Sequence, residues 1–478
     1  MRGANLGDPP ELLARADLNR VMQTREYRLI TPLFGGGVRP GEADPVTTVR
    51  GSTVRGQLRF WWRATRGGHY GNNLAKLKQA EDLLWGAAST PQNPRPALVD
   101  LSIMVTDMGQ DEPPYEVVQN ANSGRFQVRP RSHIAPSYAA FPLQPKQEAL
   151  AHWEPERDQV RTVRVGVRFC LTLAYPERWE ESVAKQFAAS PADELAAALW
   201  AWETFGGIGA RTRRGFGALE LLGVDGQNQP HLLLNELKAK LTQHLQQHVV
   251  TGAWPTGVPH LPRTLDQVRI ILRLPRERAG WDKSNGAWNH LIEQLSKFRQ
   301  WRDPPAPSKP NQPGRSRWPE PDALRRQARS PHPYHRPRLH IDKYPRAVFG
   351  LPIVIHFKDR GDPEDYTVQG ADASFDRMAS QLIVRPLVCS DGKRTASVGI
   401  AVILEGPRFP PVGIGVKAKS QKDVEPVNGA GLIPEEVASI TALAQEPRND
   451  RAPSPLADPV YAGGEVDLLM TFLNYLER

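Results

Sequence analysis

Glycine and arginine recur in the segment 205–217, which reads FGGIGARTRRGFG. Glycine lets a backbone approach a ligand closely and adopt positive φ, and the amides so exposed can bind phosphate oxygens. Arginines in the same segment could add fork-shaped, charge-assisted contacts to those phosphates. The segment therefore predicts a phosphate-holding loop. Its residues are Gly206, Gly207, Gly209, Arg211, Arg213, Arg214, Gly215 and Gly217.

Other interpretations of this loop stay open. Phe216 could stack on a base. A helix that ends at glycine, followed by a tight hairpin with solvated arginines, fits the composition equally well. The loop lacks the Gly-Lys-Ser/Thr of the Walker pattern and does not follow a strand, as a dinucleotide fingerprint must. No nucleotide cofactor is expected, and the turn TPLFGGG at 31–37 is a further point where backbone could approach a ligand.

The segment GSTVRGQLRFWWRATRG at 51–67 predicts a helix. Val54, Leu58, Trp61 and Trp62 fall at i, i+4, i+7 and i+8, which is the spacing of a buried stripe. The two tryptophans are therefore expected in the core, in preference to serving as platforms for bases. Ser52 is the expected N-cap, and Gly67 with Gly68 ends the helix.

Four arginines of this helix lie on one side, at i, i+4, i+8 and i+11. They are Arg55, Arg59, Arg63 and Arg66. Like charges at this spacing repel, and no acidic residue occurs between Val49 and Gly71. We therefore expect an anion to supply the missing charge, although a solvated helix face is the alternative. The adjacent carboxylates Glu81 and Asp82, on the next expected helix, are interpreted as solvated.

Sequence patterns for catalysis are sparse. No HExxH, Cys-X-X-Cys or Gly-X-Ser-X-Gly pattern occurs, so neither a metal site nor a catalytic residue is predicted. Cleavage of RNA without a metal would need a general base and a general acid near a 2′-hydroxyl, and His69 and Tyr70 are the candidates. The two cysteines, Cys170 and Cys389, lie in strand-like runs and are expected to be small buried hydrophobes.

The bulk composition favours an anionic partner and excludes a membrane role. The chain has 478 residues, which suggests two or three domains, and a formal net charge of +9. No stretch approaches 18 consecutive apolar residues, and the first residues have no apolar signal-peptide core. We expect a cytoplasmic protein with no membrane contact.

Hydrophobic periodicity predicts two α+β units, because a strand, helix, strands, helix, strand order occurs twice. Residues 1–22 are expected to be a tail, 23–260 the first unit and 261–478 the second. The proline-rich stretch 302–342 is expected to be a mobile basic insert, and 416–460 another loose region. Helices are predicted at 51–67, 74–85, 191–204 (with Ser190 as cap), 285–298 and 464–476. Strands are predicted at 24–31, 97–106, 162–174, 218–222, 268–274, 347–357, 381–389 and 396–404.

Three separated blocks resemble a known family. The stretch RGSTVRGQLRFWWRA at 50–64 with its preceding TPLFGGG, the loop at 205–217, and YPRAVFGLP at 344–352 with RMAS at 377–380 resemble RAMP-superfamily large subunits at the head end of type III-B CRISPR (Cmr) effector complexes. The resemblance implies two RRM-like (ferredoxin-like) domains with antiparallel sheets and a glycine-rich loop. It also implies a non-nuclease that contacts guide RNA and complementary target RNA near the guide 3′ end, beside other Cmr subunits.

Carried over by position, the basic helix sites of the family fall on Arg50, Arg55, Arg59 and Arg63, and its loop on the glycines and arginines named above. A second-half arginine falls on Arg377. Met378 stands where a basic residue is commoner, and Ser380-Gln381 replaces an expected Ser-Pro. Two other functions stay open: a guide-RNA-processing endoribonuclease, since RAMP relatives include such enzymes, and a scaffold that binds only neighbouring protein subunits.

Overall fold

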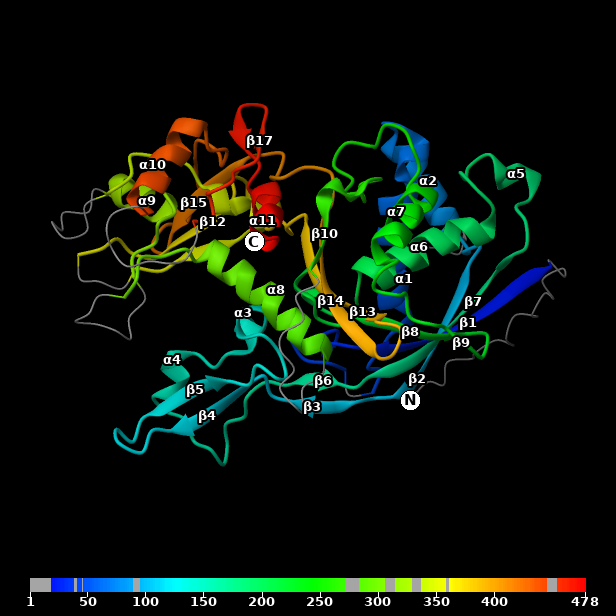
Figure 1. Ribbon diagram of the computed structural model, residues 1–478, viewed down its shortest axis with the longest axis horizontal. Coiled ribbons are helices and arrows are strands. Elements are labelled where there is room, and N and C mark those ends of the chain that lie inside the picture. The colour runs from blue at the N-terminus through cyan, green and yellow to red at the C-terminus, as the bar shows by residue number, and fades with distance from the viewer. Residues whose placement is uncertain are drawn as a thin grey trace, which may run out of the picture.

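The fold is mixed α and β with antiparallel sheets (Figure 1). The computed structural model describes residues 19–37, 41–44, 46–88, 95–271, 283–305, 314–328, 337–357, 361–444 and 454–478. The predicted N-terminal tail therefore lies almost wholly outside the described residues. None of the described helices is long and apolar enough to cross a lipid bilayer.

The first sheet is built from segments far apart in the chain. Its strands are β1 (Arg20–Leu29), β2 (Asp100–Asp107), β7 (Arg168–Pro176), β8 (Leu219–Val224) and β9 (Gln227–Asn228), in the order β2-β7-β1-β8-β9. All of the pairings are antiparallel. Helix α1 (Gly51–Arg66) follows β1, and α6 (Pro191–Phe205) follows β7. Without β9, this is the β-α-β-β-α-β succession of a split βαβ unit.

Alternation along β7 explains why the helices cover one face of this sheet. Phe169, Leu171 and Leu173 are buried, whereas the residues between them are more exposed. A strand places successive side chains on opposite faces, so the apolar set faces α1 and α6. Figure 1 shows these helices on the same side of the sheet.

The predicted apolar stripe of α1 is confirmed, since Val54, Leu58, Trp61 and Trp62 are all buried. The predicted cap is wrong: Arg50 occupies the N-cap position, and no side chain caps the helix. The cap of α6 is confirmed, because the Ser190 hydroxyl accepts from the Asp193 backbone amide at 3.2 Å.

The second sheet has three strands, β10 (Val268–Ile271), β13 (Leu382–Ser390) and β14 (Thr395–Ile403), in the order β10-β14-β13. Helix α8 (Lys283–Arg299) packs on β13 and β14, and α11 (Leu468–Leu476) packs on β10 and β14. Trp288, Leu291 and Phe298 of α8 are fully buried, as the predicted helix requires. Residues 345–349 form a 3-10 helix, so the strand predicted at 347–357 shortens to β11 (Ile353–Ile355).

Smaller elements surround these two sheets. The remaining helices are α2 (Leu74–Trp85), α3 (Ser137–Ala140), α4 (Gln147–Leu150), α5 (Glu181–Ala184), α7 (Leu237–His248), α9 (Glu320–Gln327) and α10 (Pro434–Ala444). The remaining strands are β3 (Gln110–Glu112), β4 (Tyr115–Gln119), β5 (Phe126–Pro130), β6 (Val163–Val165), β12 (Tyr366–Gly370), β15 (Ile414–Ala418), β16 (Glu425–Pro426), β17 (Tyr461–Ala462) and β18 (Glu465–Val466).

The described part of the expected insert 302–342 is packed, so that prediction is wrong there. Trp318 is fully buried, and α9 lies within the stretch. Asp303 forms ion pairs with Arg317 at 2.9 Å and with Arg338 at 2.7 Å. Paired charges thus order a segment that has no apolar periodicity. The region expected to be loose at 416–460 likewise contains α10 and the end of β15.

Arg385 of β13 joins the two sheets. Its side chain has no exposed surface, and its guanidinium donates to the carbonyls of Glu203 at 2.9 Å, Gly206 at 2.6 Å and Leu219 at 2.8 Å. All three carbonyls lie at the end of α6 or the start of β8, in the first half of the chain. Burial lowers the pKa of Arg385 to about 9, which leaves the side chain charged at neutral pH.

We predict that Arg385→Leu destabilises the protein by about 3 kcal/mol, because three buried carbonyls lose a charged donor. Urea unfolding followed by tryptophan fluorescence measures this loss. Arg394→Leu is the control, since Arg394 is exposed at the hairpin between β13 and β14. Equal midpoints for the two variants would contradict the role given to Arg385.

We also predict acid sensitivity from His248 in α7. This ring is buried beside Trp200 and lies parallel to the ring of His244, with 5.4 Å between their centroids. Burial lowers the pKa of His248 to about 4, and the charges of His244 and Arg66 act in the same direction. The charge of Asp193 acts in the opposite direction. The folded state therefore favours the neutral ring. Its contribution to stability is complete above the unfolded pKa of about 6.5 and is lost as pH falls toward 4.

We expect the free energy of unfolding to fall between pH 6.5 and pH 4 in both proteins, but less steeply in His248→Leu than in the wild type. Denaturant titrations at a series of pH values provide the measurement. Parallel curves for the two proteins would show that this ring is not responsible.

Candidate nucleic-acid interface

The countercharge for the arginine stripe comes from the neighbouring helix. Arg59 donates from Nε to Glu81 at 2.6 Å and from Nη2 to Asp82 at 3.1 Å. Arg63 Nη1 lies 2.7 Å from the same Glu81 oxygen. Glu81 is buried and is not a solvated carboxylate as expected. Protein carboxylates from α2 thus supply much of the charge that the sequence had assigned to an anion.

Arg50 at the N-cap and the other two arginines of the stripe differ in the protein partners they have. Arg50 pairs with Asp44 at 3.0 Å. Arg66 is buried, donates to the Asp193 carbonyl at 2.8 Å and lies 3.8 Å from Glu194. Arg55 is half-buried, and its Nε has no hydrogen-bond partner within the described parts of the chain. Arg55 is therefore the arginine of the stripe whose charge is least satisfied.

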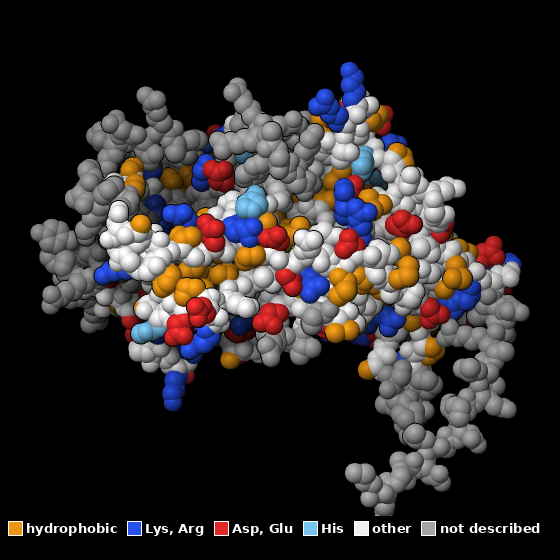
Figure 2. All heavy atoms as spheres, turned by 90° about the horizontal axis from the view of Figure 1, so that it is seen from below, with side chains coloured by type: hydrophobic (Ala, Val, Ile, Leu, Met, Phe, Trp, Pro, Cys, Tyr) orange, Lys and Arg blue, Asp and Glu red, His pale blue; other side chains and the backbone are white. Residues whose placement is uncertain are grey.

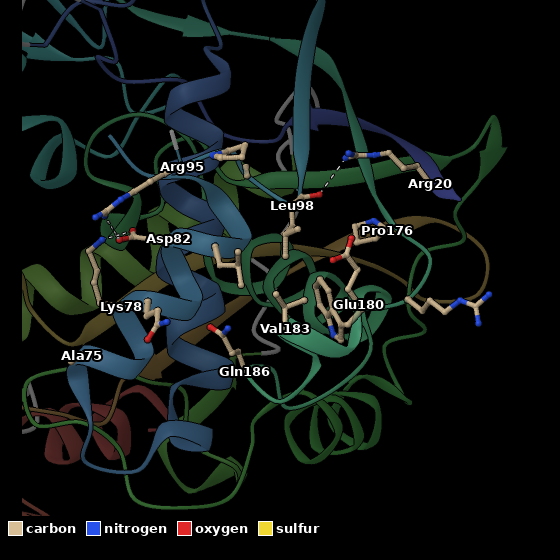
Figure 3. A pocket seen from close by; sticks show the side chains of 16 residues that line it. Arg20, Ala75, Lys78, Asp82, Arg95, Leu98, Pro176, Glu180, Val183 and Gln186 are labelled. Carbon is tan, nitrogen blue, oxygen red and sulfur yellow. Dashed lines mark hydrogen bonds and ion pairs between the residues drawn. The ribbon is translucent and has the colours of Figure 1, made fainter. Parts of the chain in front are cut away.

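A recess of about 400 Å³ lies at Arg55 and Arg59, with Gly86 and Arg95 among its other lining residues. It shares the segment 95–97 with a larger hollow of about 920 Å³ between α2 and the α5 region (Figure 3). Apolar side chains, including Leu83, Leu98 and Trp179, line much of that hollow. Figure 3 shows Lys78, Asp82 and Arg95 together on one side of it.

Positive charge is in excess around the recess. Five basic side chains gather here: Arg55, Arg59, Arg63, Lys78 and Arg95. Three carboxylates lie among them, Glu81, Asp82 and Asp100, so five minus three leaves an excess of two positive charges in the described residues. Sequence reasoning missed Lys78, Arg95 and Trp179, because no motif contains them and only the fold brings them beside α1.

The glycines of the 205–217 loop are required by contacts within the protein. A Cβ on Gly209 (φ +86°) would lie 2.6 Å from the Phe34 carbonyl oxygen, and one on Gly217 (φ +61°) 1.9 Å from that of Ile208. Gly206, Gly207 and Gly215 would meet protein atoms at 2.5 Å, 2.8 Å and 2.5 Å respectively. The glycines therefore allow the loop backbone to pack closely against other parts of the protein, whereas the sequence had predicted a close approach to a ligand.

Several loop amides already have protein acceptors. The Ala210 amide donates to the Phe34 carbonyl at 2.7 Å, and the Gly217 amide to the Pro32 carbonyl at 2.9 Å. The turn 31–37 thus packs against the loop and is not a separate point of ligand approach. Phe216 is fully buried between Phe34 and Trp288, so the prediction that it stacks on a base is wrong.

The arginines of the loop reach across to other parts of the chain. Arg211 donates to the Ala139 carbonyl at 3.1 Å, and Arg214 to the Phe349 carbonyl at 2.8 Å. Arg213 donates to the Ser380 carbonyl and lies over the ring of Phe60, 5.6 Å from its centroid. Burial lowers the pKa of Arg213 to about 10 and that of Arg214 to about 9.

The structure brings the loop beside α1 but not beside its arginine stripe. Arg213 meets α1 at Phe60, and Gly206 meets it at Trp61. Arg59 and Arg63 instead face α2. The predicted site residues therefore form two basic regions: the recess at Arg55, and the loop arginines between the two sheets.

His69 and Tyr70, the candidates for acid–base cleavage of RNA, both make contacts within the protein. The Tyr70 hydroxyl donates to the Gln186 carbonyl at 2.7 Å, and burial, with the charge of Glu194, raises the pKa of Tyr70. His69 packs edge-on against Tyr70, and burial and the Arg66 charge lower the pKa of His69. Arg377, the expected second-half arginine, is exposed and lies 3.7 Å from Asp376.

Comparison with known proteins places the first half of the chain in context. Residues 26–220 match the model of the RAMP superfamily. Two Pyrococcus furiosus proteins, CRISPR system Cmr subunits Cmr1-1 and Cmr1-2, are each 26% identical, over 179 and 202 residues. These matches cover 37% and 41% of this chain. They span 42% of the first relative and 92% of the second.

Two solved structures are also similar. Apo Cmr1 from Pyrococcus furiosus is 17% identical with a TM-score of 0.41, over 88% of this chain and 97% of that one. A chain of a type III-B Cmr-beta complex bound to cognate target RNA is 13% identical with a TM-score of 0.45, over 80% and 94%. The match to the family model confirms, over residues 26–220, the resemblance to the RAMP superfamily that the arginine helix and the glycine loop indicated.

Proposed function

We propose that this chain is a non-catalytic, RNA-binding subunit of a type III-B CRISPR Cmr effector complex, in antiviral defence. Its partners would be guide RNA and complementary target RNA near the guide 3′ end, together with other Cmr subunits. The match to the RAMP superfamily and the two relatives named as Cmr subunits support the complex. The observation that carries RNA binding is the excess of positive charge around Arg55, within the matched residues.

We also propose two RRM-like domains, divided near residue 260. The succession of elements in the first sheet supports the first domain. In the second, β10, α8, β13, β14 and α11 follow the same succession and lack only a fourth strand among the described residues.

RNA is expected on the helix side of the first domain. RRM domains stack bases on aromatic side chains of the open sheet face. Here the open face carries Met22, Thr24, Met104 and Thr172, with the two threonine hydroxyls 3.2 Å apart. Its arginines Arg20 and Arg28 are paired with Asp100 and Glu220. Figure 2 shows positive and negative side chains interspersed over the face that it views. The recess at Arg55 offers unbalanced charge, and the adjoining hollow offers apolar walls and Trp179 for a base.

The proposed RNA contacts divide according to their protein partners. Arg55 would bind phosphate directly, while Arg50, Arg59 and Arg63 would contribute charge from within their ion pairs. Arg211, Arg213 and Arg214 of the loop would form a second contact region. The loop glycines would act by shaping the backbone that carries these arginines.

The processing endoribonuclease is less well supported, because the hydroxyl of Tyr70 is already bonded to a carbonyl. A scaffold that binds only protein would bind no RNA in isolation. Binding of the purified chain to single-stranded RNA therefore separates the scaffold from the proposed function.

We predict that the full-length chain binds single-stranded RNA with an affinity that falls as salt rises, and that Arg55→Gln weakens this binding. On single strands each lost phosphate contact reduces the slope of log affinity against log salt by about 0.7. Fluorescence anisotropy with a labelled RNA, at several salt concentrations, gives both quantities. Arg55→Gln is preferable to Arg59→Gln, because Arg59 is paired with buried Glu81 and its loss would also cost stability.

Arg157→Gln is the matched control. This arginine is exposed, pairs with Glu154 at 3.4 Å and lies outside both basic regions. Its affinity and salt slope should equal those of the wild type. RNA binding unaffected by Arg55→Gln would remove Arg55 from the site, and a wild-type chain that binds no RNA would overturn RNA binding altogether.

A further inference from the structure

Arg299, at the C-terminal end of α8, lies in a pocket of aromatic side chains. Its Nη1 donates to the Tyr138 hydroxyl at 2.8 Å. The guanidinium lies over the rings of Tyr138 and Phe349, 5.9 Å and 5.6 Å from their centroids. Its Nε is buried and has no hydrogen-bond partner in the described structure. Neither motif matching nor helical periodicity had indicated this residue.

Two loop arginines converge on the same place. Arg211 donates to the carbonyl of Ala139, the neighbour of Tyr138. Arg214 donates to the carbonyl of Phe349, over whose ring Arg299 lies. Burial lowers the pKa of both loop arginines, and the charge of Arg299 lowers each further. Arg299 therefore lies close enough to both loop arginines for their charges to repel.

No carboxylate in the described part of the chain pairs with these three arginines. Among the described residues, Arg211, Arg214 and Arg299 form no ion pair, and Arg214 Nη1 is a second buried donor without a partner. The nearby Arg346 donates to the Arg299 carbonyl at 3.2 Å, but it brings its own carboxylate, Glu320, at 3.1 Å. Buried donors without acceptors cost free energy, and like charges gathered without a counterion repel.

A tetrahedral anion would satisfy this arrangement. Phosphate presents several acceptor oxygens, and guanidinium groups bind it through fork-shaped, charge-assisted hydrogen bonds. The site can be reached from solvent, since Arg211 keeps part of its surface exposed although its guanidinium is largely buried, and Tyr138 and Arg299 are half-buried. A carboxylate of the chain itself could have played this part, as Glu81 does for α1, but none is present here among the described residues.

We propose that Arg299, Arg211, Arg214 and the Tyr138 hydroxyl form a phosphate-binding site. Arg211 and Arg214 belong to the loop before β8, and Arg299 belongs to α8 on the second sheet. This site rests on the proposed function, in which the bound phosphate belongs to the RNA backbone. RNA bound here contacts both halves of the chain at once.

The test is Arg299→Met in the full-length chain. Methionine keeps an apolar chain against Tyr138 and Phe349 but removes the guanidinium. RNA affinity should fall on the order of tenfold, and the salt slope by about 0.7, the value for one phosphate contact. Arg157→Met is the control and should leave both unchanged. Tyr138→Phe, which removes only a hydroxyl, should weaken binding in the same direction by a smaller factor.

A second measurement separates the sources of phosphate. Inorganic phosphate alone should raise the thermal unfolding temperature of the wild type relative to chloride at equal ionic strength, and this increase should be absent in Arg299→Met. If the wild type binds RNA and Arg299→Met binds it with the same affinity and slope, the site is overturned while the proposed function stands. If the wild type binds no RNA, the proposed function falls, and a phosphate-dependent increase lost in Arg299→Met supports a site for free phosphate. The site would also be overturned if phosphate did not raise the unfolding temperature of the wild type and Arg299→Met did not change RNA binding.

Discussion

The buried guanidinium of Arg385 is the interaction on which the arrangement of the two halves depends. It places a charge from the second sheet at the end of α6, where it satisfies the carbonyls of Glu203 and Gly206 that the helix end leaves unpaired, and it also donates to the Leu219 carbonyl of β8. A charge in such a place is tolerated only when several acceptors surround it. Because those acceptors flank the glycine loop, the same contact fixes where the loop arginines lie.

Around this joint, the chain uses its arginines in two ways. Some are neutralised by protein carboxylates, as Arg59 and Arg63 are by Glu81. Others have no carboxylate partner among the described residues, namely Arg55 beside α2 and Arg299 at the end of α8. Ligand binding should depend mainly on the second kind, because a charge that already has a partner gains less from an incoming phosphate.

The glycine loop illustrates how one sequence feature can serve two purposes. Its glycines permit the close packing of Gly209 against the backbone of Phe34 and of Gly217 against that of Ile208. Its arginines extend from that packed loop to the carbonyls of Ala139 in α3 and Phe349 in the 3-10 helix at 345–349. The loop is therefore both a structural connection and a carrier of charge, and a flexible, open phosphate nest is not needed for the second role.

Local periodicity was sufficient to predict the helices at 51–67, 74–85 and 191–204 and the burial of Trp61 and Trp62, because these depend on spacing within one segment. The sequence also indicated the family and the basic character of α1. Spacing could not reveal that Glu81 neutralises Arg59, or that Arg299 meets the loop, since those partners are 22 and more than 80 residues away. Only the tertiary structure brings such residues together, and so it alone decided which arginines are already paired and which remain available to an anion.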